Sequence, residues 1–239
     1  MNDTDCWKMF EYDVVDSTNE TAKNICDDYT ERFVVTANVQ RVGKGQYGRK
    51  WLSPSGENLL ATFCIPQCEI TNDNLISFAA ANAVCVILKE FDFTPKCKWP
   101  NDIEVDNCKI AGILTEKIND WILIGIGLNL NWPERKSELE NGKKHTSLFA
   151  ESGKKYNVDK FVLLLSKALN LQINLSPADL LDFYKTFWNK KRNIQILVDD
   201  NWLTAKQIGI DTDGTLIAGL SSGQTIKINT SARVRTNDV

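Results

Sequence analysis

Residues 43–51 of this chain read GKGQYGRKW and combine three glycines, three cationic side chains and two aromatic ones. Glycines allow the backbone to adopt positive φ and to approach a ligand closely. Successive backbone N–H groups with Lys and Arg beside them bind anions, and Trp51 offers a flat face to a planar group. The stretch therefore predicts a loop that closes over a phosphorylated, nucleotide-like ligand.

The residues around this loop distinguish between two fold classes. Gly43, Gly45 and Gly48 match the G-x-G-x-x-G pattern of dinucleotide-binding proteins, which requires a strand before it and a helix directly after it. A strand is predicted at 33–37, but 52–56 contains a proline and a glycine typical of a turn, and 58–63 is predicted to be another strand. This order argues against a Rossmann fold. The alternative to a ligand-binding loop is a basic hairpin exposed to solvent. A second candidate site elsewhere in the sequence would argue against that alternative.

Size and composition bound the class of protein. The 239 residues are enough for one large domain, or for a large and a small one, and 43% hydrophobic with 25% charged residues is typical of globular proteins. The formal charge of −3 and the pI of about 5.4 do not indicate a nucleic-acid partner. The N-terminus lacks the apolar core of a signal peptide, and no apolar run reaches membrane-spanning length. We therefore expect a soluble, cytoplasmic protein without a membrane partner.

The cysteines and the histidine exclude several kinds of site. There are seven cysteines and no C-x-x-C pair, so neither a disulfide framework nor a zinc site is predicted, and most thiols should be reduced. The single histidine, His145, lies in a polar stretch without an evident Ser or Cys partner. A histidine-based triad and a protein metal site are therefore not expected. Catalysis should depend on lysine, arginine, carboxylate and backbone groups.

Periodicity and turn residues predict both strands and helices along the first 190 residues. Ser17 followed by Glu20 has the form of a capping box at the start of a helix. The expected strands are 12–15, 97–99 and 121–131 with a hairpin at 103–118, and the expected helices are 19–28, 74–91, 147–151, 158–171 and 177–188.

The character of the sequence changes after residue 193. Four short β-like runs, at 195–198, 203–210, 215–218 and 225–228, are separated by turn residues. Closely spaced short strands of this kind predict a small β-barrel. The predicted boundary lies near Lys191, which gives domains of residues 1–191 and 192–239.

A second candidate site combines two further segments. Residues 98–102, Lys-Trp-Pro-Asn-Asp, place a cation, an amide and a carboxylate at one turn, although Asn and Asp are also common turn formers. If the following hairpin folds back, Lys109 lies close to that turn; the alternative is a lysine extended along a sheet edge. Gly125 and Gly127 lie inside an apolar strand, which indicates close approach of a ligand or another backbone.

With these segments in order, the chain resembles the biotin–protein ligases. The matching segments are Asp16-Ser17-Thr18-Asn19, Gln40 with the loop 43–51, residues 98–102, residues 109–114 and residues 125–129. The resemblance extends from about Tyr12 to the C-terminal strands. It implies an α+β fold, in which a catalytic domain like that of class II synthetases has a mixed central sheet flanked by helices and is followed by a small SH3-like C-terminal β-barrel. Because the first motif begins at Asp16, we expect a short form without a DNA-binding extension.

The resemblance implies an ATP-dependent biotin–[acetyl-CoA-carboxylase] ligase. Such enzymes join biotin to ATP as biotinoyl-5′-AMP, release pyrophosphate, and pass biotin to one lysine of a biotin carboxyl carrier protein. Biotin, ATP and Mg²⁺ are the expected substrates and metal, with no tightly bound prosthetic group. Because a carboxylate must approach an anionic phosphate, cations and N–H donors must offset the repulsion. Exposed strand edges are compatible with a homodimer, as in many relatives.

The resemblance also implies roles for individual residues. The expected catalytic residues are Lys109, which stabilises the carboxylate and phosphate, Arg49, and Asp102, whose role as general base is a hypothesis. Biotin-binding residues would be Ser17, Thr18, Asn19, Gln40, Gly43, Lys44, Gly45, Gln46, Lys109 and Gly112. ATP-binding residues would be Lys44, Arg49, Trp51, Lys98, Asn101, Asn129 and Asn131.

The loop departs from the family pattern, which is commonly G-R-G-R-x-G-R. Lys44 keeps the charge of the first arginine but not its bidentate geometry, and Gln46 loses the charge of the second. We therefore predict that this chain holds the adenylate less tightly than an arginine-bearing relative. The alternatives are a lipoate or octanoate transferase and a non-catalytic biotin-binding regulator; residues 98–102 and the loop that ends in Trp51 favour biotin.

Overall fold

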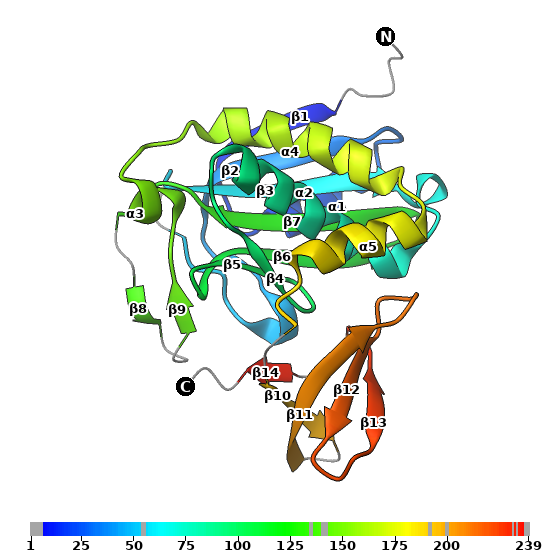
Figure 1. The fold of residues 1–239 in the computed structure, drawn as a ribbon. Coiled ribbons are helices and arrows are strands. Elements are labelled where there is room, and N and C mark those ends of the chain that lie inside the picture. The colour runs from blue at the N-terminus through cyan, green and yellow to red at the C-terminus, as the bar shows by residue number, and fades with distance from the viewer. Residues whose placement is uncertain are drawn as a thin grey trace.

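The computed structural model describes residues 7–53, 56–133, 136–139, 143–190, 193–198, 201–230, 232 and 234–236. These residues form a large mixed sheet with helices on both faces and a smaller C-terminal sheet (Figure 1). The α+β class and the mixed central sheet predicted from the sequence are confirmed.

The large sheet has the strand order β1-β2-β3-β7-β6-β5-β4. β1 and β2 are parallel, and the remaining neighbours along this path are antiparallel. β9 pairs with both β6 and β8 at the side of this path. The strands are β1 (Lys8–Val15), β2 (Phe33–Gln40), β3 (Asn58–Pro66), β4 (Lys96–Lys98), β5 (Asp102–Val105), β6 (Cys108–Ile118), β7 (Trp121–Asn129), β8 (Lys136–Leu139) and β9 (Lys143–His145).

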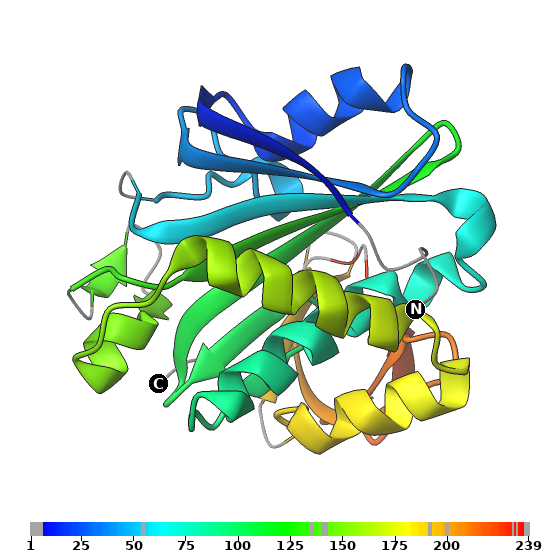
Figure 2. The ribbon, with the colours of Figure 1, turned by 90° about the horizontal axis from the view of Figure 1, so that it is seen from above.

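Helices cover both faces of this sheet. Figure 2 shows α2, α4 and α5 on one side and α1 on the other. The α-helices are α1 (Thr18–Cys26), α2 (Ile76–Glu90), α3 (Leu148–Ser152), α4 (Val158–Ile173) and α5 (Pro177–Phe187), and the 3₁₀ turns are η2 (Gln46–Gly48), η3 (Gln67–Glu69) and η4 (Asp73–Leu75). Each helix expected from the sequence is present, with small shifts at the ends.

The double cover explains why the central strands are almost continuously apolar. On β2, Val34 faces the core beneath α2 and α4, whereas Phe33 and Val35 face a smaller cluster beneath α1. On β3, Phe63 likewise faces the core beneath α2 and α4, and Cys64 faces the cluster beneath α1. Alternation of side chains along each strand therefore supplies both cores from one sheet.

The start of α1 differs from the predicted capping box. Ser17 occupies the N-cap position with extended backbone, but its side chain makes no capping hydrogen bond. Glu20 accepts hydrogen bonds from Lys23 and Lys44 instead of returning to the N-cap. The start of the helix was predicted correctly, and the capping box was wrong because Glu20 has lysine partners within reach.

The loop 43–51 leads into a strand rather than a helix. Residues 56 and 57 form a turn, and β3 follows; Pro54 lies outside the described residues. The prediction against a Rossmann fold is confirmed.

The C-terminal strands form a separate antiparallel sheet of order β13-β12-β11-β10-β14. It contains β10 (Asn193–Val198), β11 (Asn201–Ile210), β12 (Leu216–Leu220), β13 (Thr225–Ile228) and β14 (Val234–Thr236), the last of which was not predicted. No pairing joins β13 to β14 within the described ranges, so closure into a barrel stays a prediction. The predicted boundary at Lys191 lies outside the described residues, between α5 and β10.

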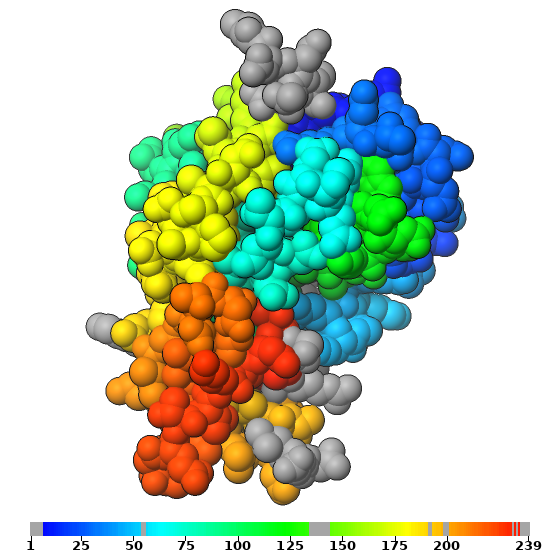
Figure 3. All heavy atoms as spheres, turned by 90° about the vertical axis from the view of Figure 1, so that its right-hand side faces the viewer, coloured from blue at the N-terminus to red at the C-terminus, as the bar shows by residue number. Residues whose placement is uncertain are grey.

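The C-terminal sheet lies against the larger part of the molecule, beside α5 (Figure 3). The Trp99 indole donates a hydrogen bond of 3.1 Å to the Gly214 carbonyl, and the Trp188 indole donates one of 3.1 Å to the Gln207 side chain. Gly214 has φ +86°, and a methyl group there would lie 2.7 Å from the Phe78 ring. Residue 214 is therefore restricted to glycine both by its backbone and by this contact.

In the part of the chain that the structure describes, none of the helices combines the length and the hydropathy needed to span a bilayer.

Candidate functional site

A cavity of about 280 Å³ lies between the loop 43–51, the start of α1 and the strands β5 to β7. It brings together segments that are far apart in the sequence. The predicted site residues that line it are Ser17, Thr18, Asn19, Gln40, Lys44, Gly45, Gln46, Arg49, Trp51, Asn101, Asp102, Lys109, Gly112 and Asn129.

One end of the cavity is a buried polar cluster at the start of α1. Gln40 Oε1 accepts hydrogen bonds from the Thr18 backbone N–H (2.8 Å) and from the Thr18 hydroxyl (3.1 Å). The Thr62 hydroxyl lies within hydrogen-bond distance of Thr18 Oγ1 (2.8 Å) and Asn19 Oδ1 (2.6 Å), and Asn19 donates to Glu116. Because buried polar groups need partners, this network fixes the side chains before any ligand arrives.

The β5–β6 hairpin supplies the charged pair of the site. Its register places Asp102 opposite Gly112, and the Lys109 ammonium reaches back to form an ion pair with the Asp102 carboxylate. The two side chains are only 17% and 12% exposed. The prediction that the hairpin returns Lys109 to the turn is confirmed. Asn101 holds the turn on β6, because it donates to the Ile113 carbonyl at 2.8 Å.

The indole of Trp51 lies over the strands at the centre of the site. Lys109 Nζ is 5.3 Å from the centroid of the ring, within cation–π range. A methyl group at Gly112 would lie 2.9 Å from the ring, and one at Gly127 would overlap it. At Gly125 the added atom would overlap the Asn19 amide. The close approach predicted at these strand glycines is therefore made by side chains.

The Trp51 Nε1–H is buried and has no hydrogen-bond partner among the residues that the structure describes. An unpaired donor of this kind is unusual in a folded protein. Because it lies in a cavity lining, it suits a ligand that carries an acceptor.

The loop 43–51 is folded as a small hairpin. Gly45 N–H donates to the Arg49 carbonyl at 2.7 Å, and Trp51 N–H donates to the Gly43 carbonyl at 2.9 Å. The Lys44 ammonium pairs with Glu20 on α1 at 2.7 Å. These contacts hold the loop over the cavity.

Charges behind the loop form a continuous network. Hydrogen bonds from Lys23 and then Lys44 lower the pKa of Glu20. Burial by itself lowers the pKa of Lys23, but hydrogen bonds to Glu116 and Glu20 outweigh it and raise that pKa. Since Glu116 also accepts from Asn19, the network joins the loop to the polar cluster.

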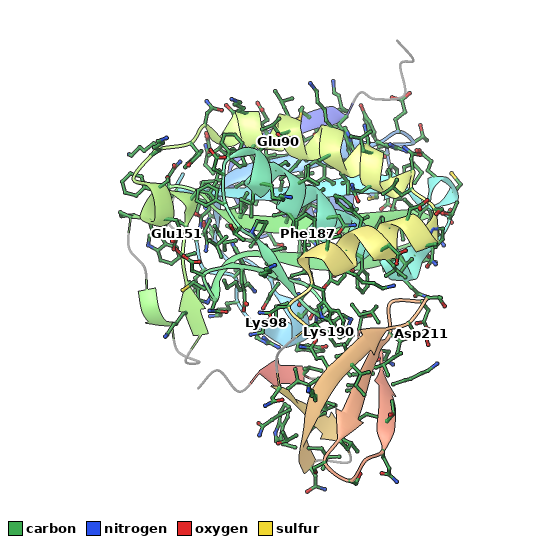
Figure 4. The ribbon with its side chains drawn as sticks, viewed as in Figure 1. Glu90, Lys98, Glu151, Phe187, Lys190 and Asp211 are labelled. Carbon is green, nitrogen blue, oxygen red and sulfur yellow. The ribbon has the colours of Figure 1, made fainter. Side chains whose placement is uncertain are left out.

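Three predicted site residues do not line the cavity: Gly43, Lys98 and Asn131. Gly43 supports the loop through its carbonyl. Lys98 lies at the end of β4 near the C-terminal sheet (Figure 4) and pairs with Glu104 at 3.5 Å. Asn131 exchanges two hydrogen bonds with the Tyr156 backbone, at 2.9 Å and 2.8 Å, which gives it a structural role.

Sequence reasoning missed several residues of the cavity lining. His145 lines the cavity from β9, where its backbone is paired with that of Lys109 on β6. The stretch around it was interpreted as polar loop, so its short strands gave no usable signal. The other missed lining residues are Lys50, Leu52, Ala61, Ile113, Leu114, Gly125, Ile126 and Gly127; the two glycines did carry a signal, as breaks in an apolar strand.

No group of three or more His, Cys, Asp or Glu side chains that could hold a metal occurs among the residues placed by the structure. The cavity does contain one carboxylate beside cationic groups, at Asp102. Such a lining suits an anionic ligand.

Comparison with known proteins gives consistent results. A family model described as "Biotin/lipoate A/B protein ligase family" matches residues 11–131. The bifunctional ligase/repressor BirA of Escherichia coli is 28% identical over 217 residues, which cover 85% of this chain and 67% of BirA. The biotin–[acetyl-CoA-carboxylase] ligase of Paracoccus denitrificans is 31% identical over 164 residues, which cover 64% of this chain and 68% of that protein.

A solved structure shares the whole fold. The biotin protein ligase from Aquifex aeolicus, in complex with biotin and ATP, superposes with a TM-score of 0.81 at 22% identity. The match covers 96% of this chain and 99% of that one. At this identity the likeness establishes the fold, including the C-terminal sheet.

Proposed function

The chain belongs to the biotin/lipoate A/B protein ligase family, and from this premise we propose that it is an ATP-dependent biotin–protein ligase. In the first step a biotin carboxylate oxygen attacks the α-phosphorus of ATP, biotinoyl-5′-AMP forms and pyrophosphate leaves. In the second step a lysine amine of a carrier domain attacks the acyl carbon, loses a proton and displaces AMP. The relatives named above are biotin ligases, which favours biotin over lipoate.

One observation carries the proposal: a single cavity joins a fixed polar cluster, a lysine–carboxylate pair and a glycine-rich cationic loop. These are the groups that the two steps require, because both reacting partners of the first step are anionic. No enzyme nucleophile is needed.

The polar cluster at the start of α1 is the place for the polar end of biotin. Ser17, Thr18 and Gln40 present fixed hydrogen-bonding groups there. Ala61, Ile113 and Ile126 line the same cavity and suit the apolar ring system and chain of biotin.

The nucleotide lies beneath the loop and Trp51. The indole supplies a stacking face and an unpaired N–H, and Arg49 and Lys44 supply positive charge. Lys109 acts where the carboxylate and the α-phosphate meet, since its ammonium lies between Asp102 and the Trp51 ring. Lys98 lies outside the cavity lining. It contributes to the nucleotide site indirectly, because its ion pair with Glu104 supports the β5–β6 hairpin.

Mg²⁺ enters with ATP as its phosphate complex and neutralises part of the phosphate charge. Magnesium is typically held by phosphates, water and one or two carboxylates, and Asp102 is a carboxylate in the cavity lining. The donor set therefore fits the metal as part of the substrate.

Asp102 is the candidate general base for the second step. Its carboxylate lies beside Lys109, where the acyl group would be presented. When Lys109 turns to the substrates, Asp102 becomes available to accept the proton of the incoming amine.

Partners and location follow from the same proposal. The carrier is a biotin carboxyl carrier protein domain. The described cysteines are all free thiols, which supports a reducing, cytoplasmic setting. The homodimer and the lack of a nucleic-acid partner stay predictions.

The test is incubation of the chain with ATP, Mg²⁺, biotin and a carrier domain, followed by the intact mass of the carrier. We expect one biotinyl group on one lysine, which requires both ATP and biotin. A carrier that acquires lipoate or octanoate but not biotin would overturn the proposal.

A further inference from the structure

Tyr47, at the tip of the glycine-rich loop, has a backbone conformation that its side chain does not favour. Its φ of 60° and ψ of 34° lie in the left-handed region, which costs free energy for a bulky residue other than glycine. Such a conformation persists where other contacts of the residue compensate for it.

The Tyr47 side chain contacts both the segment between β13 and β14 and the Arg49 side chain. Its hydroxyl lies 2.7 Å from the Ala232 carbonyl oxygen, to which it donates a hydrogen bond, and 3.4 Å from the Thr230 carbonyl oxygen. The Arg49 guanidinium carbon lies 5.5 Å from the centroid of the Tyr47 ring. The loop and the last strand lie beside each other in two views (Figures 1 and 3).

We propose that Tyr47 is a positioning residue that ties the ligand loop to the C-terminal sheet and holds Arg49 over the cavity. Lys44 fastens the loop to α1 through Glu20, and Tyr47 fastens its opposite side to the C-terminal sheet. Opening the loop breaks the Tyr47–Ala232 hydrogen bond. The tether therefore slows departure of whatever the loop covers.

This inference rests on the proposed function, in which the covered molecule is biotinoyl-AMP. Gln46 is uncharged and cannot hold the adenylate phosphate as an arginine would. The tether limits the resulting loss of the intermediate by stabilising the closed loop rather than by contacting the ligand.

The first test needs no ligand. Tyr47→Phe removes the hydroxyl and keeps the ring for Arg49. Because one hydrogen bond of this kind contributes modestly, we expect the Gly45 and Trp51 amides to exchange with deuterium about three- to tenfold faster than in the wild type. The matched control is Tyr12→Phe, since Tyr12 is 38% exposed and Tyr47 is 40% exposed. Unchanged loop exchange in Tyr47→Phe would overturn the tether.

The second test measures release of biotinoyl-AMP. In Tyr47→Phe we expect release to accelerate by about the same factor, with the midpoint of thermal unfolding unchanged. Faster exchange with unchanged release would overturn the role in retention. If the wild type makes no biotinoyl-AMP, the proposed function fails, and the exchange experiment still decides the tether.

A third variant separates the two contacts. Tyr47→Asn removes both the hydroxyl and the ring, while asparagine tolerates the left-handed conformation. We expect faster release of biotinoyl-AMP than in Tyr47→Phe, because Arg49 also loses its contact with the Tyr47 ring. Equal release in the two variants would overturn the part assigned to Arg49.

Discussion

The Lys109 ammonium and the Asp102 carboxylate form an ion pair across the β5–β6 hairpin, with both side chains largely buried. The cavity thus contains a pair of opposite charges that offset each other. An anionic carboxylate and phosphate would draw Lys109 away from Asp102, and this exchange of partners links the two proposed steps.

Lys109→Gln should slow formation of biotinoyl-AMP by about 10²- to 10³-fold, the usual cost of removing one donor aimed at developing charge. Biotin-dependent exchange of pyrophosphate into ATP measures this rate. Lys117→Gln, on an exposed ammonium of the same strand, is the control. A Lys109 variant within threefold of the wild type would contradict the assignment.

Asp102→Asn should slow transfer of biotin from supplied biotinoyl-AMP to the carrier by about 10²-fold, because it removes the candidate base. Starting from supplied adenylate bypasses the first step. Asp106→Asn, at the exposed turn of the same hairpin, should leave transfer unchanged. Transfer at the normal rate in Asp102→Asn would remove the general-base assignment.

Gln46→Arg should slow release of biotinoyl-AMP by about three- to tenfold, because it restores a cation beside the adenylate phosphate. Release is measured by trapping the free adenylate after rapid mixing. Gln46→Lys separates charge from bidentate geometry. If neither variant slows release, Gln46 is not the cause of weak retention.

Gly127→Ala should weaken ATP binding by about tenfold or more, because the added methyl group would overlap the Trp51 indole and displace it. Titration calorimetry with ATP measures the effect. Gly209→Ala, whose methyl group would meet only an ordinary contact at 3.7 Å, is the matched control. Equal affinity of both variants would show that Trp51 does not contribute to the nucleotide site.

Glu20→Gln should reduce stability most at neutral pH. The lysine hydrogen bonds lower the pKa of Glu20 in the folded chain, so its contribution is present above the unfolded pKa and is lost as the pH falls through the folded pKa. Because Glu20 and its lysine partners are partly exposed, we expect the free energy of unfolding to fall by at most ~1 kcal/mol. Urea unfolding should show the free energies of unfolding of the wild type and the variant converging as the pH falls below the ordinary pKa of a glutamate. A difference that stays constant with pH would contradict this.

The sequence predicted the parts of the fold that local patterns determine. Short apolar runs identified β2 and β3, and alternation around turn residues identified the hairpin that returns Lys109 to Asp102. The short strands β8 and β9, which pair with each other and through β9 with β6, were missed because they lie in a polar stretch. His145 was therefore not recognised as part of the lining.

The sequence predicted which segments build the site more reliably than it predicted which of their side chains point into the cavity. Lys98 and Asn131 belong to segments that build the site, but one pairs with Glu104 and the other with the Tyr156 backbone. Which face a polar side chain takes near a turn depends on neighbours distant in sequence. The same limit applies to Glu20, whose lysine partners replaced the predicted capping box.

The central claim is that this cavity activates biotin with ATP. Exchange of labelled pyrophosphate into ATP by the purified chain, with and without biotin, tests it most directly. The account predicts exchange that requires biotin and that Lys109→Gln nearly abolishes. Biotin binding without any exchange would identify the chain as a binding protein and contradict the account.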